Sequence, residues 1–335
     1  MIKDWYYYYK LPKRLKNAYE LILKGINNEL SFISLDPIEI KPEEIEKVVL
    51  SIELDNPDIF FVDFHKFTFG SNGQFITSIN INHIYSKKDK RNLQKLITKS
   101  LNGIHDKLNI ESLDEYTKEI QIYEFLEKNI TYDYSSLNSS FDSFEFFKAN
   151  SIIGSLLDKN ATCLGISKGL KLVLNSFGIR SIVVTGIGKS NNIGNMENHA
   201  WNIVKIHDEN YHVDLTWDIT LKSTRMSYDY FNLTDSLVCK DHKCDDIALP
   251  ICNSTKYNYF SVNNLVMNSE NDLSNYLNRL KNRNEKYVYI KLNYKCNIND
   301  VIRKIASVIA VNGNANSSFV CEYNLNQGIV KVGEK

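Results

Sequence analysis

The stretch TCLGISKGLKLVLNSFG, residues 162–178, decides the fold expected for this chain. Its apolar residues recur at helical spacing, so it predicts a helix over Thr162–Phe177, which Gly178 would end in a left-handed conformation. Cys163 stands at the predicted start of this helix, directly after Thr162, a residue type that caps helices. Unpaired N–H groups and the positive end of the helix dipole favour a thiolate at this position. Gly165 and Gly169, one turn apart, predict that the helix packs closely against a sheet.

Two downstream segments carry the partners that a thiolate nucleophile needs. His199 opens a predicted strand over Asn198–Ile206, and Asp214 lies on the next one, over Tyr211–Trp217. A thiolate needs a base to share its proton, and that base needs a carboxylate or an amide to fix its tautomer. Cys163 and His199 are therefore the candidate nucleophile and base.

Two carboxylates are candidates for the group that orients His199, and the spacing of the two strands does not decide between them. With Asp208-Glu209 as the turn, Asp214 projects from the same face as His199 but lies four residues from the position opposite it. Asp218 is the residue directly opposite His199 in this register. At roughly 3.3 Å per residue, Asp214 could reach His199 only through a bulge or a strong twist.

Five motifs in this region resemble the bacterial transglutaminase-like superfamily over residues 118 to 235. They are Thr-Cys163-Leu-Gly-Ile-Ser, Phe-Gly178-Ile-Arg, Val-Thr-Gly186, His199-Ala-Trp-Asn and Tyr211-His-Val-Asp214-Leu-Thr-Trp. The resemblance implies a papain-like core of the α+β class, with the nucleophile helix packed on an antiparallel sheet. It implies that Cys163 is the nucleophile, His199 the general base and acid, and Asp214, rather than Asp218, the orienting group. It also implies a local irregularity in the hairpin.

The second donor to the oxyanion stays open among three residues. The resemblance implies a side chain upstream of the nucleophile, in addition to the backbone N–H groups at the helix start. Tyr132, Tyr134 and Asn160 all lie upstream, and no motif selects one of them. Trp201 and Trp217 are expected to be core or cleft-wall aromatics.

The length of 335 residues predicts two or three domains. We expect an N-terminal α+β accessory domain over residues 1–115, the catalytic core over 116–250, and a small C-terminal α/β domain over 251–335. The first would contain helices over Pro12–Asn27 and Lys90–Leu108, with a hairpin turn at Gly70–Gly73. The last would contain a helix over Ile298–Val311 between strands, after an Asn-rich stretch over Asn253–Asn284.

Composition excludes several classes of function. The chain has 40 basic and 40 acidic residues, which argues against a nucleic-acid partner. No run of 18 apolar residues and no secretory signal are evident, so no membrane association is expected. Its six cysteines are too sparse for a disulfide scaffold, and we expect free thiols and a cytoplasmic location.

The sequence thus predicts acyl transfer from a protein or peptide amide through a thioester, with hydrolysis favoured over transfer to an amine. No cofactor and no metal are expected, and the oligomeric state is open. One alternative is a binding scaffold that keeps the fold without activity. Another is a zinc-dependent interaction through a loop that carries Cys239, His242, Cys244 and Cys252.

Overall fold

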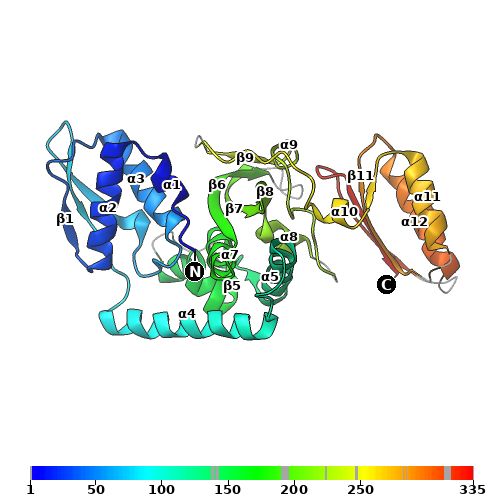
Figure 1. Ribbon diagram of the computed structural model, residues 1–335, viewed down its shortest axis with the longest axis horizontal. Helices are drawn as coiled ribbons and strands as arrows, with labels where there is room; N and C mark the ends of the chain where they lie inside the picture. The colour runs from blue at the N-terminus through cyan, green and yellow to red at the C-terminus, as the bar shows by residue number, and fades with distance from the viewer. Residues whose placement is uncertain are drawn as a thin grey trace.

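The computed structural model describes residues 2–136, 140, 143–189, 196–222, 225–245, 248–281, 283, 285–312 and 318–334. Figure 1 shows an elongated molecule in which the elements follow one another along the long axis. The first helices and strands lie at one end, the helix α7 and its sheet lie in the middle, and the C-terminal sheet and helices lie at the other end. The long helix α4 runs beneath the first two groups and connects them.

The N-terminal elements are helices packed around a small antiparallel sheet of order β1-β3-β2. The elements are α1 (Tyr6–Lys10), α2 (Lys13–Asn27), β1 (Phe32–Ser34), α3 (Pro42–Asp55), η1 (Phe64–Lys66), β2 (Thr68–Ser71), β3 (Ile76–Asn80) and α4 (Lys87–Leu108). The predicted helices over Pro12–Asn27 and Lys90–Leu108 are present, and so is the hairpin, although its turn lies at residues 72–75 because Gly70 and Ser71 end strand β2. Helix α3 was not predicted.

The central elements build one antiparallel sheet of order β8-β7-β6-β9, on which α7 packs. The predicted packing of the helix that begins at Cys163 on an antiparallel sheet is therefore confirmed. The elements are α5 (Glu115–Asn129), β4 (Thr131–Tyr132), α6 (Phe144–Ala149), the π-helical turn η3 (Gly154–Asp158), β5 (Asn160–Ala161), α7 (Cys163–Ser176), β6 (Arg180–Lys189), β7 (Met196–Ile206), β8 (Glu209–Val213), α8 (Leu215–Leu221), α9 (Asp235–Val238) and β9 (His242–Cys244).

The C-terminal elements form a four-stranded sheet of order β10-β11-β13-β12, covered by two helices. They are α10 (Tyr259–Val262), β10 (Val266–Met267), α11 (Glu270–Leu280), β11 (Tyr287–Leu292), α12 (Ile298–Asn312), β12 (Phe319–Asn324) and β13 (Ile329–Glu334). The Asn-rich stretch contains α11, because Leu273, Leu277 and Leu280 bury one face of that helix. The division of the chain into three domains stays a prediction.

Helix α7 is enclosed on all sides, and its two lysines are buried with it. Lys168 forms an ion pair of 2.8 Å with Glu53 of α3. Lys171, which is 0% exposed, donates to the carbonyl of Leu54 at 2.8 Å. Burial lowers the pKa of Lys171 to about 8, although the charge of Asp55 opposes this shift. Because a buried ammonium must be paired, α7 requires α3 beside it.

The hairpin that follows α7 differs from the predicted register. Ile206 pairs with Glu209 and Lys205 with Asn210, so the turn is His207-Asp208 rather than Asp208-Glu209. His207 adopts a φ of 51°, which a two-residue hairpin turn requires. Strand β8 ends at Val213, and residues 215–217, predicted as strand, begin helix α8 instead. Asp214 is the N-cap of that helix, so the expected irregularity is the end of the strand.

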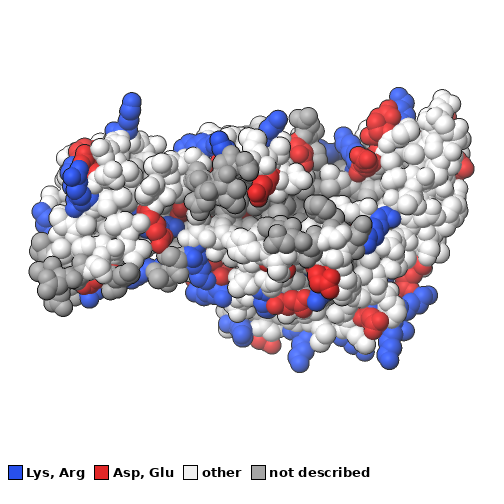
Figure 2. Space-filling model, turned by 180° about the vertical axis from the view of Figure 1, so that it is seen from behind, with Lys and Arg blue, Asp and Glu red and all other residues white. Residues whose placement is uncertain are grey.

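Charged side chains of both signs lie on the surface. Figure 2 shows basic and acidic side chains interspersed over the face turned to the viewer. Of the helices among the described residues, none combines the length and the apolar character needed to cross a membrane.

We expect the buried carboxyl of Glu119 in α5 to make stability fall as the pH rises. Burial raises the pKa of Glu119 from 4.5 to about 8, although Asn232 donates to it at 2.8 Å. The folded state therefore binds a proton that the unfolded state has released, and this contribution to stability is lost between about pH 4.5 and pH 8. Glu119→Gln should flatten the dependence of Tm on pH over this range. Equal slopes for both proteins in calorimetry would contradict the assignment.

Candidate active site

Cys163 is the first residue of α7 and is half-buried. Thr162 is the N-cap by position, but its hydroxyl does not cap the helix. It donates instead to Asn150 Oδ1 at 2.7 Å. The prediction that the Thr162 side chain caps the helix is therefore wrong. The end of α6 lies beside the helix start, and Asn150 there accepts the hydrogen bond instead. The first N–H groups of a helix have no partner within it, so they can receive an oxyanion next to the Cys163 thiol.

Gly165 and Gly169 allow close packing, but against other elements than the predicted sheet. A Cβ atom on Gly165 would lie 2.1 Å from the Ala149 carbonyl oxygen, at the end of α6. One on Gly169 would lie 2.4 Å from Ser155 Oγ, in η3. The two glycines thus let α6 and η3 contact α7 directly. They set the position of the helix start that carries Cys163.

His199 lies on β7 opposite Gly186 of β6, with its side chain 8% exposed. Its Nε2 is 2.7 Å from Asp214 Oδ2, and the ring also hydrogen-bonds to the Cys163 side chain. Because Nε2 faces Asp214, Nδ1 is the nitrogen left for Cys163. Burial by itself lowers the pKa of His199, but Asp214 and Cys163 outweigh burial and raise it above its usual value.

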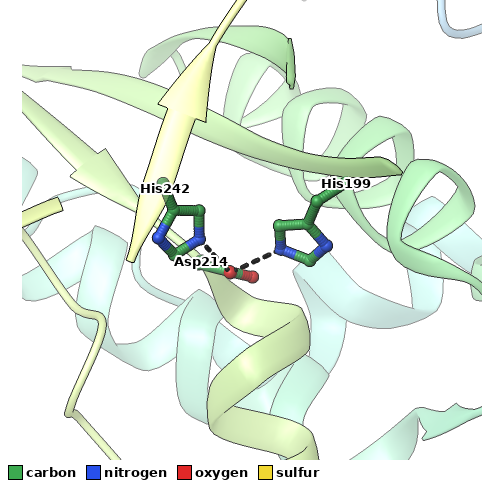
Figure 3. A group of neighbouring side chains, drawn as sticks. All are labelled: His199, Asp214 and His242. Carbon is green, nitrogen blue, oxygen red and sulfur yellow. Dashed lines mark hydrogen bonds and ion pairs between the residues drawn. The ribbon is translucent and has the colours of Figure 1, made fainter. Parts of the chain in front are cut away.

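Asp214 receives three hydrogen bonds at the junction of β8 and α8. Its Oδ1 accepts from the backbone N–H of Trp217 at 3.1 Å, which caps α8. Its Oδ2 faces Nε2 of both His199 and His242, at 2.7 Å and 3.0 Å (Figure 3). Burial would raise the pKa of Asp214, yet the two histidines hold it well below its usual range. Asp214 is thus an ionised carboxylate.

Asp218, the rival orienter, is not at His199. It lies on α8 and accepts from Ser227 Oγ at 2.8 Å and from the backbone N–H of Tyr230 at 3.1 Å. It also accepts from the hydroxyl of Tyr123. The structure therefore brings Cys163, His199 and Asp214 together and places Asp218 in a separate buried network.

His242 is a residue that sequence reasoning missed at this site. It lies on β9, which pairs with β6, so it reaches Asp214 from the edge of the sheet. The sequence suggested His242 only as a zinc ligand. The alternating stretch His242-Lys-Cys244 is too short to predict a strand, and nothing in its spacing points to Asp214.

The structure offers two groups of three side chains that could hold a metal, among the described residues. They are His199, Asp214 and His242, and His212, Asp235 and Cys252. The four residues of the predicted zinc loop are not gathered in either group, because Cys239 is exposed while His242 and Cys252 are buried in different groups. In the first group both imidazoles already hydrogen-bond to Asp214, so hydrogens on the two rings satisfy the carboxylate.

The two tryptophans surround the histidines as cleft wall and core. Trp217 is half-buried, and its ring centroid lies 5.2 Å from that of His199 and 4.1 Å from that of His242. It thus contacts both of the rings that hydrogen-bond to Asp214. Trp201 is 0% exposed and donates to His212 Nδ1 at 3.0 Å.

Of the three candidates for the oxyanion donor, Tyr132 is the one whose pKa responds to the charge of Cys163. Burial raises the pKa of Tyr132, and the charge of Cys163 raises it further. Tyr134 is 62% exposed and stacks edge-on against the Tyr132 ring. Asn160 is bonded to Thr131 at 3.0 Å and to Asp133. Tyr132 is therefore the candidate that the charge interaction with Cys163 favours.

Residues 104–215 match the family model of the transglutaminase-like superfamily. The match confirms the resemblance over this segment, which contains Cys163, His199 and Asp214. No curated protein sequence matches the chain.

Two solved structures show a weaker likeness to the chain. One, a crystal structure of a TGase, has 17% identity, covers 49% of this chain and 47% of that chain, and gives a TM-score of 0.33. The other, a candidate protease from Parabacteroides distasonis, has 14% identity, covers 46% and 39%, and gives a TM-score of 0.26. The chain thus spans less than half the length of either protein.

We expect Gly188→Ala to disturb the His199 ring while leaving the fold intact. A Cβ atom at Gly188 would lie 2.8 Å from Trp217 Cζ2 and 3.3 Å from His199 Cβ, so one of these side chains must move. The rate at which iodoacetamide alkylates Cys163 should fall about tenfold or more. Gly103→Ala on α4 is the control, since a Cβ atom there meets nothing within 4 Å. An unchanged rate in Gly188→Ala would contradict the expected displacement of the His199 ring.

Proposed function

We propose that the chain is a cysteine-dependent enzyme that cleaves amide bonds of proteins or peptides through a thioester. The proposal rests on three residues that contact one another in succession. Cys163 at a helix start hydrogen-bonds to His199, and His199 in turn binds the buried Asp214 at 2.7 Å. A nucleophile, a base and a carboxylate in this order form the arrangement that thiol acyl transfer needs.

The proposed reaction begins with attack of the Cys163 thiolate on the carbonyl carbon of the substrate amide. The negative charge moves to the carbonyl oxygen, where the N–H groups at the start of α7 and the Tyr132 hydroxyl would donate to it. The C–N bond then breaks, and Nδ1 of His199 gives its proton to the departing amine. A thioester on Cys163 remains.

Water completes the proposed cycle. Neutral His199 takes a proton from water, the hydroxide attacks the thioester carbon, and the C–S bond breaks to release a carboxylic acid. We place hydrolysis ahead of transfer to an amine, because water needs no binding site of its own. The substrate, a protein or a peptide, and a cytoplasmic location belong to the same proposal.

Cys163 should react with iodoacetamide near neutral pH far faster than the other five cysteines. Burial raises the pKa of Cys239, Cys244, Cys252, Cys296 and Cys321, so these thiols stay protonated. His199→Ala removes the partner of the thiolate and should slow the labelling of Cys163 about 100-fold. Peptide mapping by mass spectrometry measures both results. Uniform, slow labelling of all six would favour the binding scaffold instead.

Cys163→Ala should abolish thioester formation and product release. Incubation of both proteins with a peptide library, followed by mass spectrometry, reports cleaved and amine-linked products together. Amine-linked products alone would overturn the preference for hydrolysis, and full activity of Cys163→Ala would overturn the whole mechanism.

Tyr132→Phe should lower kcat about 100-fold with little change in KM, because the hydroxyl would bind only the developing oxyanion. Tyr134→Phe is the matched control, since it removes a hydroxyl from the exposed neighbouring ring. The comparison needs a peptide found by the library experiment. Equal kcat values for the two variants would assign the second donor to another group.

A further inference from the structure

We propose that His242 is an imidazolium that positions Asp214 for His199, and that the turn between β12 and β13 holds it in place through Asp241. This inference rests on the proposed function, because it assigns a further positioning residue to the same site. It also makes the C-terminal segment a structural part of the active site.

His242 lies between two carboxylates, both within hydrogen-bond distance. Its Nε2 is 3.0 Å from Asp214 Oδ2, and its Nδ1 is 2.7 Å from Asp241 Oδ1. An ionised carboxylate only accepts hydrogen bonds, so each ring nitrogen must carry a hydrogen. The side chain of His242 is 0% exposed, which leaves no room for a solvent partner at either nitrogen. The geometry therefore requires the doubly protonated, cationic form.

The charged and titratable groups around His242 come from five parts of the chain. Asp214 precedes α8, Asp241 precedes β9, His199 comes from β7, and Tyr230 donates to Asp241 from the segment before α9. His212 on β8 is close enough that the charge of His242 contributes to lowering the pKa of His212, after the effect of burial. The cationic rings of His199 and His242 thus share the site with the carboxylates of Asp214 and Asp241, and the charges balance.

The second carboxylate is anchored by the C-terminal segment. Gln327, in the turn at residues 325–328, donates from Nε2 to Asp241 Oδ2 at 3.2 Å and to the Leu237 carbonyl at 3.1 Å. Both partners are acceptors, which fixes the orientation of the amide. Lys291 of β11 in turn donates to the Gln327 carbonyl at 2.8 Å. Gln327 is 1% exposed, so this residue of the turn is buried against the base of the site.

His242 would act on His199 through Asp214 in two ways. Its hydrogen bond fixes the carboxylate in the orientation that meets Nε2 of His199. Its charge offsets that of Asp214, so that His199 holds its proton less tightly and can release it to the departing amine. Without His242, the unbalanced carboxylate would keep His199 protonated to higher pH.

The first test reads the protonation of His242 in the unaltered chain. Long-range ¹H–¹⁵N spectra of protein labelled on histidine distinguish protonated from bare ring nitrogens, and His242→Gln assigns the signals. We expect both nitrogens of His242 to carry hydrogens near neutral pH. A bare nitrogen in His242 would overturn the proposal, whatever the activity of the chain.

The second test follows the rate of Cys163 alkylation against pH. In His242→Gln, which keeps a donor but has no charge, the pH range over which the Cys163–His199 pair loses its proton should move upward by about one pH unit. Gln327→Ala should move it in the same direction, by less. Leu325→Ala is the control in the same turn, because that side chain is 63% exposed, and it should leave the profile unchanged.

The two tests separate the failure of this inference from the failure of the proposed function. If Cys163 is unreactive in the unaltered chain while His242 is cationic, the proposed function is wrong and the assignment of His242 stands. If Cys163 is reactive but the profile of His242→Gln, folded by circular dichroism, equals that of the unaltered chain, His242 does not act on His199 and the inference is overturned.

Discussion

The buried carboxylate of Asp214 is the constraint on which the site depends. It is 2% exposed, and a buried charge left without partners costs about 3–5 kcal/mol. Three donors meet it: the backbone of Trp217, His199 and His242. Each donor comes from a different element, so one carboxylate fixes the start of α8, the ring on β7 and the edge strand β9 relative to one another. The position of His199 follows from that arrangement.

The helix that carries Cys163 imposes a second constraint, through its own burial. Lys168 and Lys171 point into protein rather than water, and α3 supplies Glu53 and the Leu54 carbonyl to them. In addition, Asn202 of β7 donates to the Ser167 carbonyl at 3.0 Å and ties the helix to the strand of His199. The distance between Cys163 and His199 is thus set by contacts of α7 with both α3 and β7. The N-terminal helices therefore help to hold the site in position.

The sequence predicted the parts of the site that local patterns specify. The helix at Cys163, the strand at His199 and the glycine after the helix follow from periodicity and turn chemistry, and all are present, with Gly178 at a φ of 87°. The register of the β7–β8 hairpin could not be predicted from these patterns, because a hairpin can turn on either of two neighbouring pairs of polar residues. The predicted turn shifted every pair, and it made Asp218 the residue opposite His199. Only the family resemblance selected Asp214.

The sequence could not predict His242 because its partners are set by tertiary pairing alone. β9 has three residues, and its place beside β6 depends on the network that holds Asp241 from Tyr230 and Gln327. Gln327 lies 86 residues further along the chain than Asp241. A contact of this range leaves no periodicity in either segment. The same feature explains why the C-terminal segment, which carries no motif, nevertheless reaches the Asp214 carboxylate through only two intervening side chains.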